Sequence, residues 1–286
     1  MNAELGRFKT PDGLDLYYEY WIPAEPRGVL LIVHGLGEHC GRYGAFVRYL
    51  TDRNYIVALY DHRGHGKSQG KRVFAESLEV LIDDLVQFVA AAQKKFPEQT
   101  FWTLLGQSLG GQIVLNYAAN FSHPFVGVIA CSPNLEIAAP LPAWKLKAAD
   151  WLHKRKPTFR LREMFSPTWL SHDFKVVRSY IQDPLISRYV TVSLGQAILE
   201  NLKKIPSLTQ KIRTPILFLH GTADRICNPQ ATLRFYEELA FQEKEIRLYE
   251  GLYHELLNEV TCEKVYGDIE QWLEKRRQQF SASLAS

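Results

Sequence analysis

Residues 100–111 read TFWTLLGQSLGG, and no other segment of the chain restricts the fold as strongly. An apolar run typical of a buried strand ends at Gly106, and a segment with little polar surface, typical of a buried helix, starts near Leu109. Gly106-Gln107-Ser108-Leu109-Gly110 is a G-x-S-x-G pattern between them. In this context the pattern predicts a sharp strand-to-helix turn that exposes the serine hydroxyl, because glycines two residues away on either side remove clashing side chains.

Further strands and helices alternate on both sides of this turn. Continuous apolar runs predict buried strands at residues 29–33, 55–60, 126–130, 216–219 and 246–249. Apolar residues at helical spacing predict helices over residues 78–96 and from 260 to about 276. Alternating residues around Pro11-Asp12-Gly13 predict an N-terminal hairpin. The order indicates an α/β fold in which helices cover both faces of a mostly parallel sheet.

One segment breaks the alternation. Residues 134–205 contain no clear buried strand, but several helical pieces rich in Trp, Leu and Lys. An insert at this point is expected to form a helical cap over the carboxyl ends of the strands, where ligands bind in open α/β sheets. We therefore expect one core, made of residues 1–133 and 206–286, with the cap inserted at 134–205.

Composition excludes several classes of function. The 286 residues are 46% hydrophobic and carry a formal charge of only +3, with no basic patch interleaved with aromatics, which argues against nucleic acid as a partner. No zinc-ligand spacing and no G-x-G-x-x-G motif occurs, so we expect no metal and no cofactor. The four cysteines are scattered and are expected to be unpaired thiols. No obligate protein partner is evident.

The N-terminal residues lack the apolar region of a secretory signal, and no run of about 18 apolar residues occurs. Together with unpaired thiols, this pattern predicts a cytoplasmic protein.

A serine hydroxyl needs an adjacent base to act as a nucleophile. In chains with this turn, the acid and then the histidine follow the serine in sequence. Of the nine histidines, only His254 follows the last predicted strand. Asp224 follows the strand before it, whereas Asp61 precedes the serine and Asp183 lies in the cap, where a turn or a helix cap explains it. The predicted triad is Ser108, Asp224 and His254.

Acyl transfer also needs donors for the oxyanion of the tetrahedral intermediate. One is expected to be the backbone N–H of Leu109, directly after the nucleophile, and the other that of Leu36 in the early loop His34-Gly35-Leu36-Gly37. The role needs a backbone amide, so a leucine can fill it.

Several motifs together resemble the monoacylglycerol lipase and lysophospholipase family of α/β-hydrolases. They are HGLGEH at residues 34–39, GRY at 41–43, DHRGHGKS at 61–68, DPLI at 183–186, GTADR at 221–225 and YEGLYH at 249–254. The similarity runs from the first strand to the last helix and is weakest between about residues 135 and 181. Gln107 departs from the histidine that is common in the family.

The resemblance implies a cofactor-independent hydrolase that cleaves monoacylglycerols to fatty acid and glycerol through a Ser-His-Asp acyl-enzyme mechanism. It also places Glu38 and Arg42 near the glycerol end of the pocket; the alternative is a loop ion pair that shapes the first helix. A lysophospholipase and a general medium-chain carboxylesterase remain open as alternatives. A non-catalytic lipid-binding module is the more distant one.

The cap differs from the core in charge. It holds twelve Lys or Arg and six Asp or Glu, a local charge of +6. Residues 141–156 place Leu141, Trp144, Trp151 and Leu152 near one helical face surrounded by basic residues, a pattern that can rest peripherally on an anionic membrane. The alternative, which the general behaviour of apolar helix faces favours, is that this face packs on the core or lines an acyl tunnel.

Overall fold

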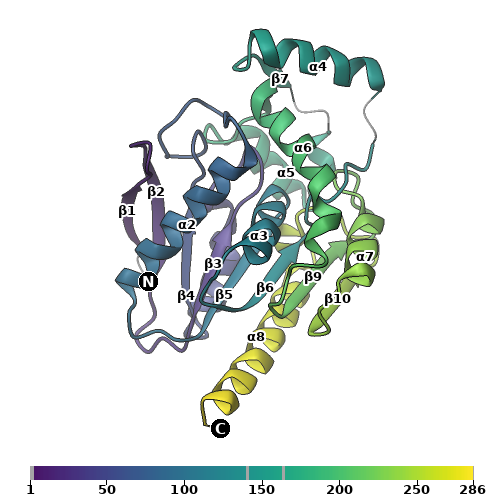
Figure 1. The fold of residues 1–286 in the computed structure, drawn as a ribbon. Coiled ribbons are helices and arrows are strands. Elements are labelled where there is room, and N and C mark those ends of the chain that lie inside the picture. Colours follow the sequence, from purple (N-terminus) through teal and green to yellow (C-terminus); the bar gives the residue numbers. More distant parts are fainter. Residues whose placement is uncertain (1–2, 140–141, 163–164, 286) are drawn as a thin grey trace.

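An eight-stranded sheet forms the centre of the computed structural model, which describes residues 3–139, 142–162 and 165–285 (Figure 1). The strands are β1 (Glu4–Lys9), β2 (Asp15–Trp21), β3 (Val29–Val33), β4 (Ile56–Tyr60), β5 (Trp102–Gln107), β6 (Phe125–Cys131), β9 (Ile216–Gly221) and β10 (Lys244–Tyr249). Their order is β1-β2-β4-β3-β5-β6-β9-β10. The pairs β1–β2 and β2–β4 are antiparallel and all others are parallel, so the predicted mostly parallel sheet is confirmed.

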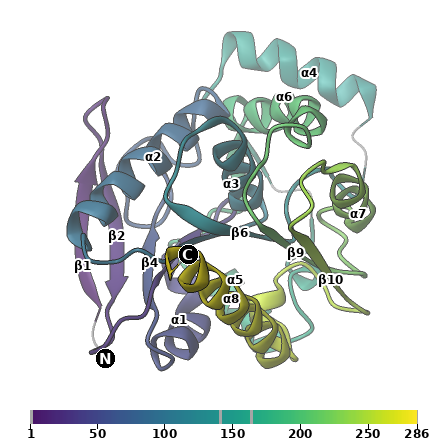
Figure 2. The ribbon, with the colours of Figure 1, turned by 60° about the horizontal axis from the view of Figure 1, so that its bottom comes forward.

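Helices cover both faces of this sheet, as predicted. Figure 2 shows α2, α3 and α6 on one side of the sheet and α1 and α8 on the other. Leu31 of β3 packs in one apolar cluster with residues of α2, α3, α6 and α7, whereas Leu30 and Ile32 pack in a second cluster with α1 and α8. Because both faces of β3 are buried, its sequence is apolar throughout. The helices are α1 (Gly44–Thr51), α2 (Leu78–Lys95), α3 (Leu109–Asn120), α6 (Val192–Leu208), α7 (Pro229–Glu238) and α8 (Cys262–Ala285).

The last strand differs from the expectation. Residues 246–249 were predicted to be a buried strand, but β10 is the edge of the sheet, and of its residues only Tyr249 is buried. Leu248 is 44% exposed. An edge strand has only one neighbour, so its apolar residues are less covered than those of the central strands.

Between β6 and β9 the chain leaves the sheet and forms the cap. Its elements are α4 (Ala143–Arg155), β7 (Arg160–Arg162), a 3-10 turn (Pro167–Trp169), α5 (Phe174–Gln182), β8 (Tyr189–Thr191) and the first part of α6. The antiparallel pair β7–β8 was not predicted, because strands of three residues are too short to leave an apolar run in the sequence. Leu141, part of the predicted cap helix, lies outside the described residues.

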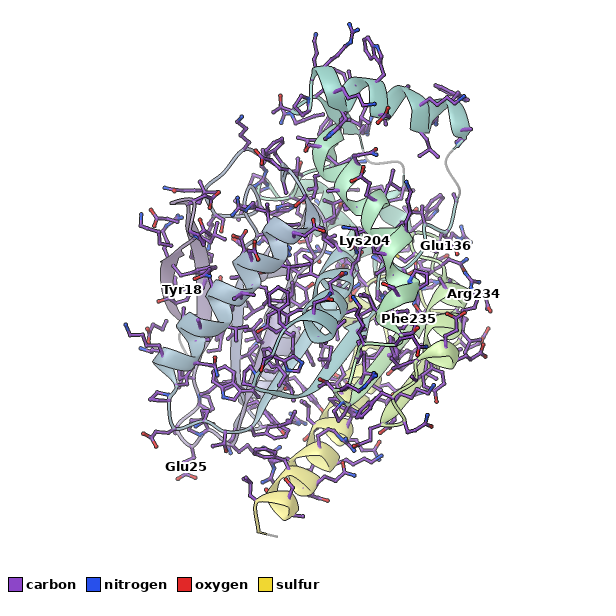
Figure 3. All side chains as sticks on the ribbon, viewed as in Figure 1. Tyr18, Glu25, Glu136, Lys204, Arg234 and Phe235 are labelled. Carbon is purple, nitrogen blue, oxygen red and sulfur yellow. The ribbon has the colours of Figure 1, made fainter. Side chains whose placement is uncertain are left out.

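The base of the cap is tied to the core on two sides (Figure 3). Lys204 of α6 donates to Glu79 of α2 at 2.6 Å, and Arg234 of α7 pairs with Glu136 at 2.5 Å. The helix α6 also continues past the predicted boundary at 205 to Leu208, which packs in the apolar core. In contrast, α4 stands at the outer end of the molecule and has no buried residue (Figure 1).

Candidate active site

Ser108 lies in the predicted turn between β5 and α3, with backbone angles φ 54° and ψ −114°. A non-glycine residue rarely adopts a positive φ, and strain of this kind clusters at functional sites. A Cβ at Gly106 would lie 2.2 Å from the carbonyl oxygen of Gly110, and one at Gly110 would lie 2.0 Å from that of Val33. Close backbone packing therefore requires both glycines of the G-x-S-x-G pattern.

Asp224 and His254 follow β9 and β10 at the edge of the sheet where β5 also ends. Their side chains are buried, and Nδ1 of His254 lies 2.7 Å from Oδ2 of Asp224. Burial opposes the charged forms of both groups. Nevertheless, the charge of Asp224 and its hydrogen bond raise the pKa of His254, and the charge of His254 with hydrogen bonds from His220 and His254 lowers the pKa of Asp224.

His220 is a second partner of Asp224 that the sequence analysis missed. It lies 3.0 Å from Oδ2 of Asp224 through Nε2, and its Nδ1 lies 2.8 Å from Oγ1 of Thr232. The backbone N–H groups of Ile226 and Cys227 donate to Oδ1 at 2.8 and 3.0 Å. This network fixes the orientation of the carboxylate. The position of His220, four residues before the acid at a strand end, is the signal that could have identified it.

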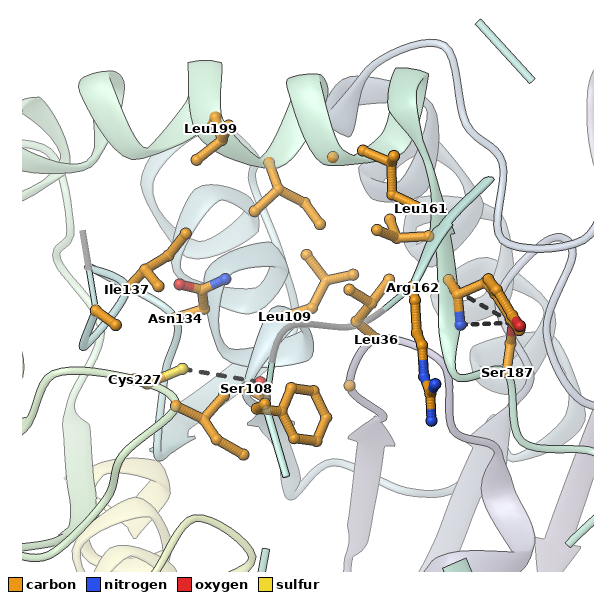
Figure 4. Close-up of a pocket in the computed structure, with 18 of the residues that line it drawn as sticks. Leu36, Ser108, Leu109, Asn134, Ile137, Leu161, Arg162, Ser187, Leu199 and Cys227 are labelled. Atoms are coloured by element: carbon orange, nitrogen blue, oxygen red, sulfur yellow. Dashed lines mark hydrogen bonds between the residues drawn. The ribbon is translucent and has the colours of Figure 1, made fainter. Parts of the chain in front are cut away.

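Ser108 and His254 line the same cavity, but in the described part of the chain no hydrogen bond joins their side chains. Oγ of Ser108 instead lies 4.0 Å from Sγ of Cys227 (Figure 4). Catalytic hydrogen bonds are often formed only in the complex with substrate. Rotation of the serine side chain away from Cys227 would be needed before His254 could accept its proton.

Among the described residues, one group of three side chains could hold a metal ion: Asp224, Cys227 and His254, whose ligand atoms lie within 4.8 Å of one another. Burial raises the pKa of the Cys227 thiol well above its usual range, with a further contribution from Asp224. A metal would require the thiolate, and it would compete with His254 for Asp224. The donor set therefore suits the hydrogen-bonded pair better than an ion.

The loop that carries Leu36 packs directly on Ser108. A Cβ at Gly35 would lie 3.2 Å from Cβ of Ser108, and the N–H of Gly35 donates to Oε1 of Glu38 at 2.5 Å. Gly37 has φ +77°, and its carbonyl accepts from the N–H of Ser187 in the cap at 2.8 Å. Both Leu36 and Leu109 line the cavity beside Ser108 (Figure 4).

Three buried histidines pack together next to the loop that carries Leu36. The rings of His34 and His62 lie 4.2 Å apart, and His65 lies 5.5 Å from His34. Nε2 of His34 accepts from the N–H of His62 at 3.0 Å, which requires an uncharged ring nitrogen. Burial lowers the pKa of all three, that of His65 to about 4. They are structural neighbours of the site.

The two residues expected near the glycerol end do not pair with each other. Oε1 of Glu38 accepts from Gly35 and from the hydroxyl of Tyr43 at 2.9 Å, whereas Arg42 forms a buried ion pair with Glu255. Burial and the charge of Glu255 raise the pKa of Glu38, and Arg42 opposes this shift. Glu255 was not predicted, because the family motif ends at His254.

A buried carboxylate, Glu259, holds the His254 loop against the cap. Its Oε1 accepts from the N–H of Tyr253 at 2.8 Å and lies 2.9 Å from Nδ1 of His172, and its Oε2 accepts from the N–H of His172 at 3.1 Å. The ring of His172 also stacks on Tyr253 at 3.8 Å. The loop and the cap are thus linked next to His254, which no sequence signal indicated.

The two rival acids lie apart from His254. Asp61 accepts from the N–H groups of Cys40 and Lys67 at 2.8 and 2.7 Å and so fixes two loops. Asp183 ends α5 and lies 2.9 Å from Nε2 of His39. Both therefore have structural partners other than His254.

A cavity of about 590 Å³ extends from Ser108 into the cap (Figure 4). Apolar side chains from the loop of Leu36, from Ile137 and from α6 make up most of its wall, and Trp144, Ala148 and Leu152 of α4 line it on the cap side. These three residues follow one another at four-residue spacing, so they share one face of the helix. Of the face that the sequence predicted, Trp144 and Leu152 therefore line the cavity, whereas Trp151 is exposed and does not.

A sequence profile of the family described as serine aminopeptidase, S33, matches residues 24–261. The chain is also 35% identical to a monoglyceride lipase of Rattus norvegicus over 96% of this chain and 91% of that protein. It belongs to this family of α/β-hydrolases. Among solved structures, a monoacylglycerol lipase of Paleococcus ferrophilus is 32% identical, with a TM-score of 0.83 over 91% of this chain and 99% of that one. A monoglyceride lipase of Saccharomyces cerevisiae, at 24% identity, shares the fold with a TM-score of 0.87 over 96% of both chains.

As a member of the monoglyceride lipase family, the chain is a carboxylic ester hydrolase. All four cysteines, Cys40, Cys131, Cys227 and Cys262, are free, as the scattered spacing predicted. Within the described residues, no helix is both long enough and apolar enough to cross a membrane.

Proposed function

We propose that this chain hydrolyses the acyl ester of monoacylglycerols, with Ser108 as nucleophile, His254 as general base and Asp224 as the acid that orients the histidine. The observation that carries the proposal is the position of Ser108, in a strained turn at the floor of an apolar cavity that His254 also lines. The buried pair His254–Asp224 supports the assignment of base and acid, because a carboxylate at Nδ1 leaves Nε2 free to accept a proton.

The mechanism follows from these positions. Oγ of Ser108 attacks the ester carbonyl while His254 accepts its proton, and the N–H groups of Leu36 and Leu109 stabilise the oxyanion. His254 then protonates the leaving glycerol oxygen, which breaks the ester bond and leaves the acyl group on Ser108. Water, activated by the same histidine, attacks the acyl-enzyme and releases the fatty acid. No cofactor takes part in these steps.

The two ends of the substrate suit different parts of the cavity. We assign the acyl chain to the apolar part under α4 and α6, where burial of methylene groups is favourable. We assign the glycerol head to the part near Glu38, whose carboxylate lines the cavity and can accept from a hydroxyl group. Arg42 takes part through Glu255 rather than by direct contact with the cavity.

The test compares a monoacylglycerol, a lysophosphatidylcholine and 4-nitrophenyl butyrate as substrates of the wild type and of Ser108→Ala. We expect the highest kcat/KM for the monoacylglycerol and no turnover by the variant. Ser132→Ala is the matched control, because Ser132 is also a serine with positive φ at a strand end, and this variant should stay active. A higher kcat/KM for the lysophospholipid would identify a lysophospholipase, and preference for the short ester a general carboxylesterase.

A fluorophosphonate probe checks the remaining alternatives. Labelling of the wild type at Ser108 indicates an activated nucleophile, whereas folded protein that neither reacts nor hydrolyses any ester would be a non-catalytic lipid-binding module. Because the family description names an aminopeptidase, an aminoacyl anilide belongs in the same assay. Faster hydrolysis of the anilide than of every ester would contradict the proposed function.

We also propose that α4 rests peripherally on anionic membranes. Trp144 and Trp151 are 68% and 56% exposed, and basic residues surround them on the same helix: Lys145, Lys147, Lys154, Arg155 and Lys156. Exposed tryptophans with lysines suit the lipid interface. Sedimentation with phosphatidylglycerol vesicles tests this. Binding should fall at least about tenfold in Trp144→Ala/Trp151→Ala, and equal binding by that variant would rule out the contact.

A further inference from the structure

Three charged side chains lie together beside the proposed reaction centre: Glu38, Arg42 and Glu255, here called the head-group trio. Arg42 and Glu255 form an ion pair in which the side chains are 6% and 7% exposed. Asn258 donates to the same oxygen of Glu255 at 3.0 Å, so that carboxylate has two donors. The guanidinium of Arg42 also lies over the ring of Tyr180, 5.2 Å from its centre. The ion pair with Glu255 and the contact with Tyr180 hold Arg42 in this buried position.

The trio lies close to the reacting atoms. Glu255 directly follows His254, and Glu38 and Glu255 both line the cavity that contains Ser108. A Cβ on Gly35 would lie 2.8 Å from Oε1 of Glu38 and 3.2 Å from Cβ of Ser108. Oε1 of Glu38 and Cβ of Ser108 are thus no farther apart than these two distances combined. With the glycerol head placed near Glu38 as proposed, a substituent on the alcohol side of the ester lies beside the trio.

The trio contains two carboxylates and one guanidinium. Only the carboxylates are among the described residues that line the cavity, while Arg42 faces Glu255 and Tyr180. The other cations on the cavity wall, Lys145, Arg162 and Arg225, are exposed, so water screens them. An anion that entered this part of the cavity would lose water and meet carboxylates without gaining a free cation.

We infer that Glu255 is a specificity-determining residue that excludes anionic head groups, because it occupies Arg42 in a buried ion pair. The inference rests on the proposed function and deepens it: esters of a neutral alcohol such as glycerol are accepted, and acylglycerol phosphates are rejected. Exclusion of a competitor by like charge is a common route to specificity. Head-group choice is thereby separated from the triad and from the acyl cavity.

The experiment measures kcat/KM for 1-oleoylglycerol and for its 3-phosphate in the same neutral micelles. The wild type should prefer the neutral lipid by at least about 100-fold. Glu255→Gln frees Arg42 and should reduce this ratio at least about tenfold. The double variant Arg42→Gln/Glu255→Gln removes the cation as well, so the preference for the neutral lipid should return. Glu250→Gln, the same change at an exposed position four residues before His254, should keep the wild-type ratio.

Loss of one member leaves a buried charge unpaired, so Glu255→Gln needs a backup that keeps all three charges of the trio. Asn258→Lys adds a cation beside Glu255 at a half-buried position and should shift the ratio in the same direction. The inference is overturned if Glu255→Gln or Asn258→Lys folds and keeps the wild-type ratio, if the double variant behaves like the single one, or if the wild type hydrolyses both lipids equally.

A separate substrate pair distinguishes this failure from failure of the proposed function. If the wild type hydrolyses neither lipid but does hydrolyse 4-nitrophenyl butyrate, the monoacylglycerol assignment is wrong. The same variants are then compared on the butyrate esters of 4-hydroxybenzyl alcohol and of 4-hydroxybenzoate, each acylated at the phenol oxygen. The leaving phenol is neutral at its para substituent in the first ester and carries a carboxylate there in the second. Restored turnover of the anionic ester by Glu255→Gln supports the inference, and an unchanged ratio overturns it.

Discussion

Asp224→Asn tests the assignment of the acid most directly. The substitution keeps the size of the side chain but removes the negative charge 2.7 Å from Nδ1 of His254. In the proposed mechanism His254 becomes positively charged during attack by Ser108, so the substitution destabilises the transition state. With charge centres about 4 Å apart and an effective dielectric constant of about 20, the lost attraction is about 4 kcal/mol, or roughly a thousandfold in rate. An amide at this position can also select the wrong tautomer of the histidine, which can bring the loss to about 10⁴-fold.

The assay is kcat/KM for 4-nitrophenyl butyrate as a function of pH. His254 must be uncharged to act as a base, so activity is lost as the pH falls through its pKa. Asp224 raises this pKa, so the wild-type acid limb should lie above pH 6.5, and in Asp224→Asn it should move to lower pH. Thermal unfolding measured in parallel separates loss of activity from loss of fold, because Asp224 also accepts from Ile226 and Cys227.

Asp183→Asn is the matched control, because it removes another hydrogen bond between an aspartate and a histidine, that to His39 at 2.9 Å, away from His254. This variant should stay within about tenfold of the wild type, since no charge that stabilises the transition state is lost. The assignment is refuted if Asp224→Asn stays within tenfold and Asp183→Asn is inactive, or if the acid limb does not move.

Three further predictions concern the oxyanion loop, the histidine cluster and the acyl cavity. Gly35→Ala should lower kcat by about ten- to 100-fold with little change in KM, because the added Cβ would push on Glu38 and Ser108. Gly44→Ala is the control, because its Cβ would meet open space, and it should keep wild-type activity. Equal activity of the two variants would contradict this prediction. His65 has a pKa of about 4 in the fold against 6.5 in the unfolded chain, so the unfolded chain binds more protons between these values and stability is lost as the pH falls from 6.5 to 4; His65→Gln should remove roughly 3 kcal/mol of this loss between pH 7 and 4, and an unchanged pH dependence of urea unfolding would refute it. Ala148→Phe should lower kcat/KM for oleoyl esters at least about tenfold and leave kcat/KM for butyryl esters unchanged. Leu146→Phe, outside the cavity wall, should change neither value. A parallel loss on both chain lengths would show that α4 does not line the acyl path.

The central sheet could be predicted because its signals are local. β3 is apolar throughout and β5 contains a shorter apolar run, since both strands are buried throughout, and an apolar run needs no knowledge of its neighbours to be recognised. The edge position of β10 could not be predicted, because a strand's sequence does not state how many neighbours it has. Likewise, β7 and β8 are three residues each and largely exposed, so they leave no periodic pattern.

The positions of Ser108, Asp224 and His254 were predicted from the sequence, because in a parallel sheet successive strands end at the same edge and the residues that follow them meet there. The G-x-S-x-G pattern carries its own reason, since only glycine fits beside the turn. What the tertiary structure alone decided are the contacts between residues far apart in the chain: the ion pair of Arg42 with Glu255, the neighbour Cys227 beside Ser108, and the link from Glu259 to His172. Such contacts depend on the packing of loops and cap against one another, and burial then fixes which charges can remain unpaired, a property that no single stretch of sequence contains.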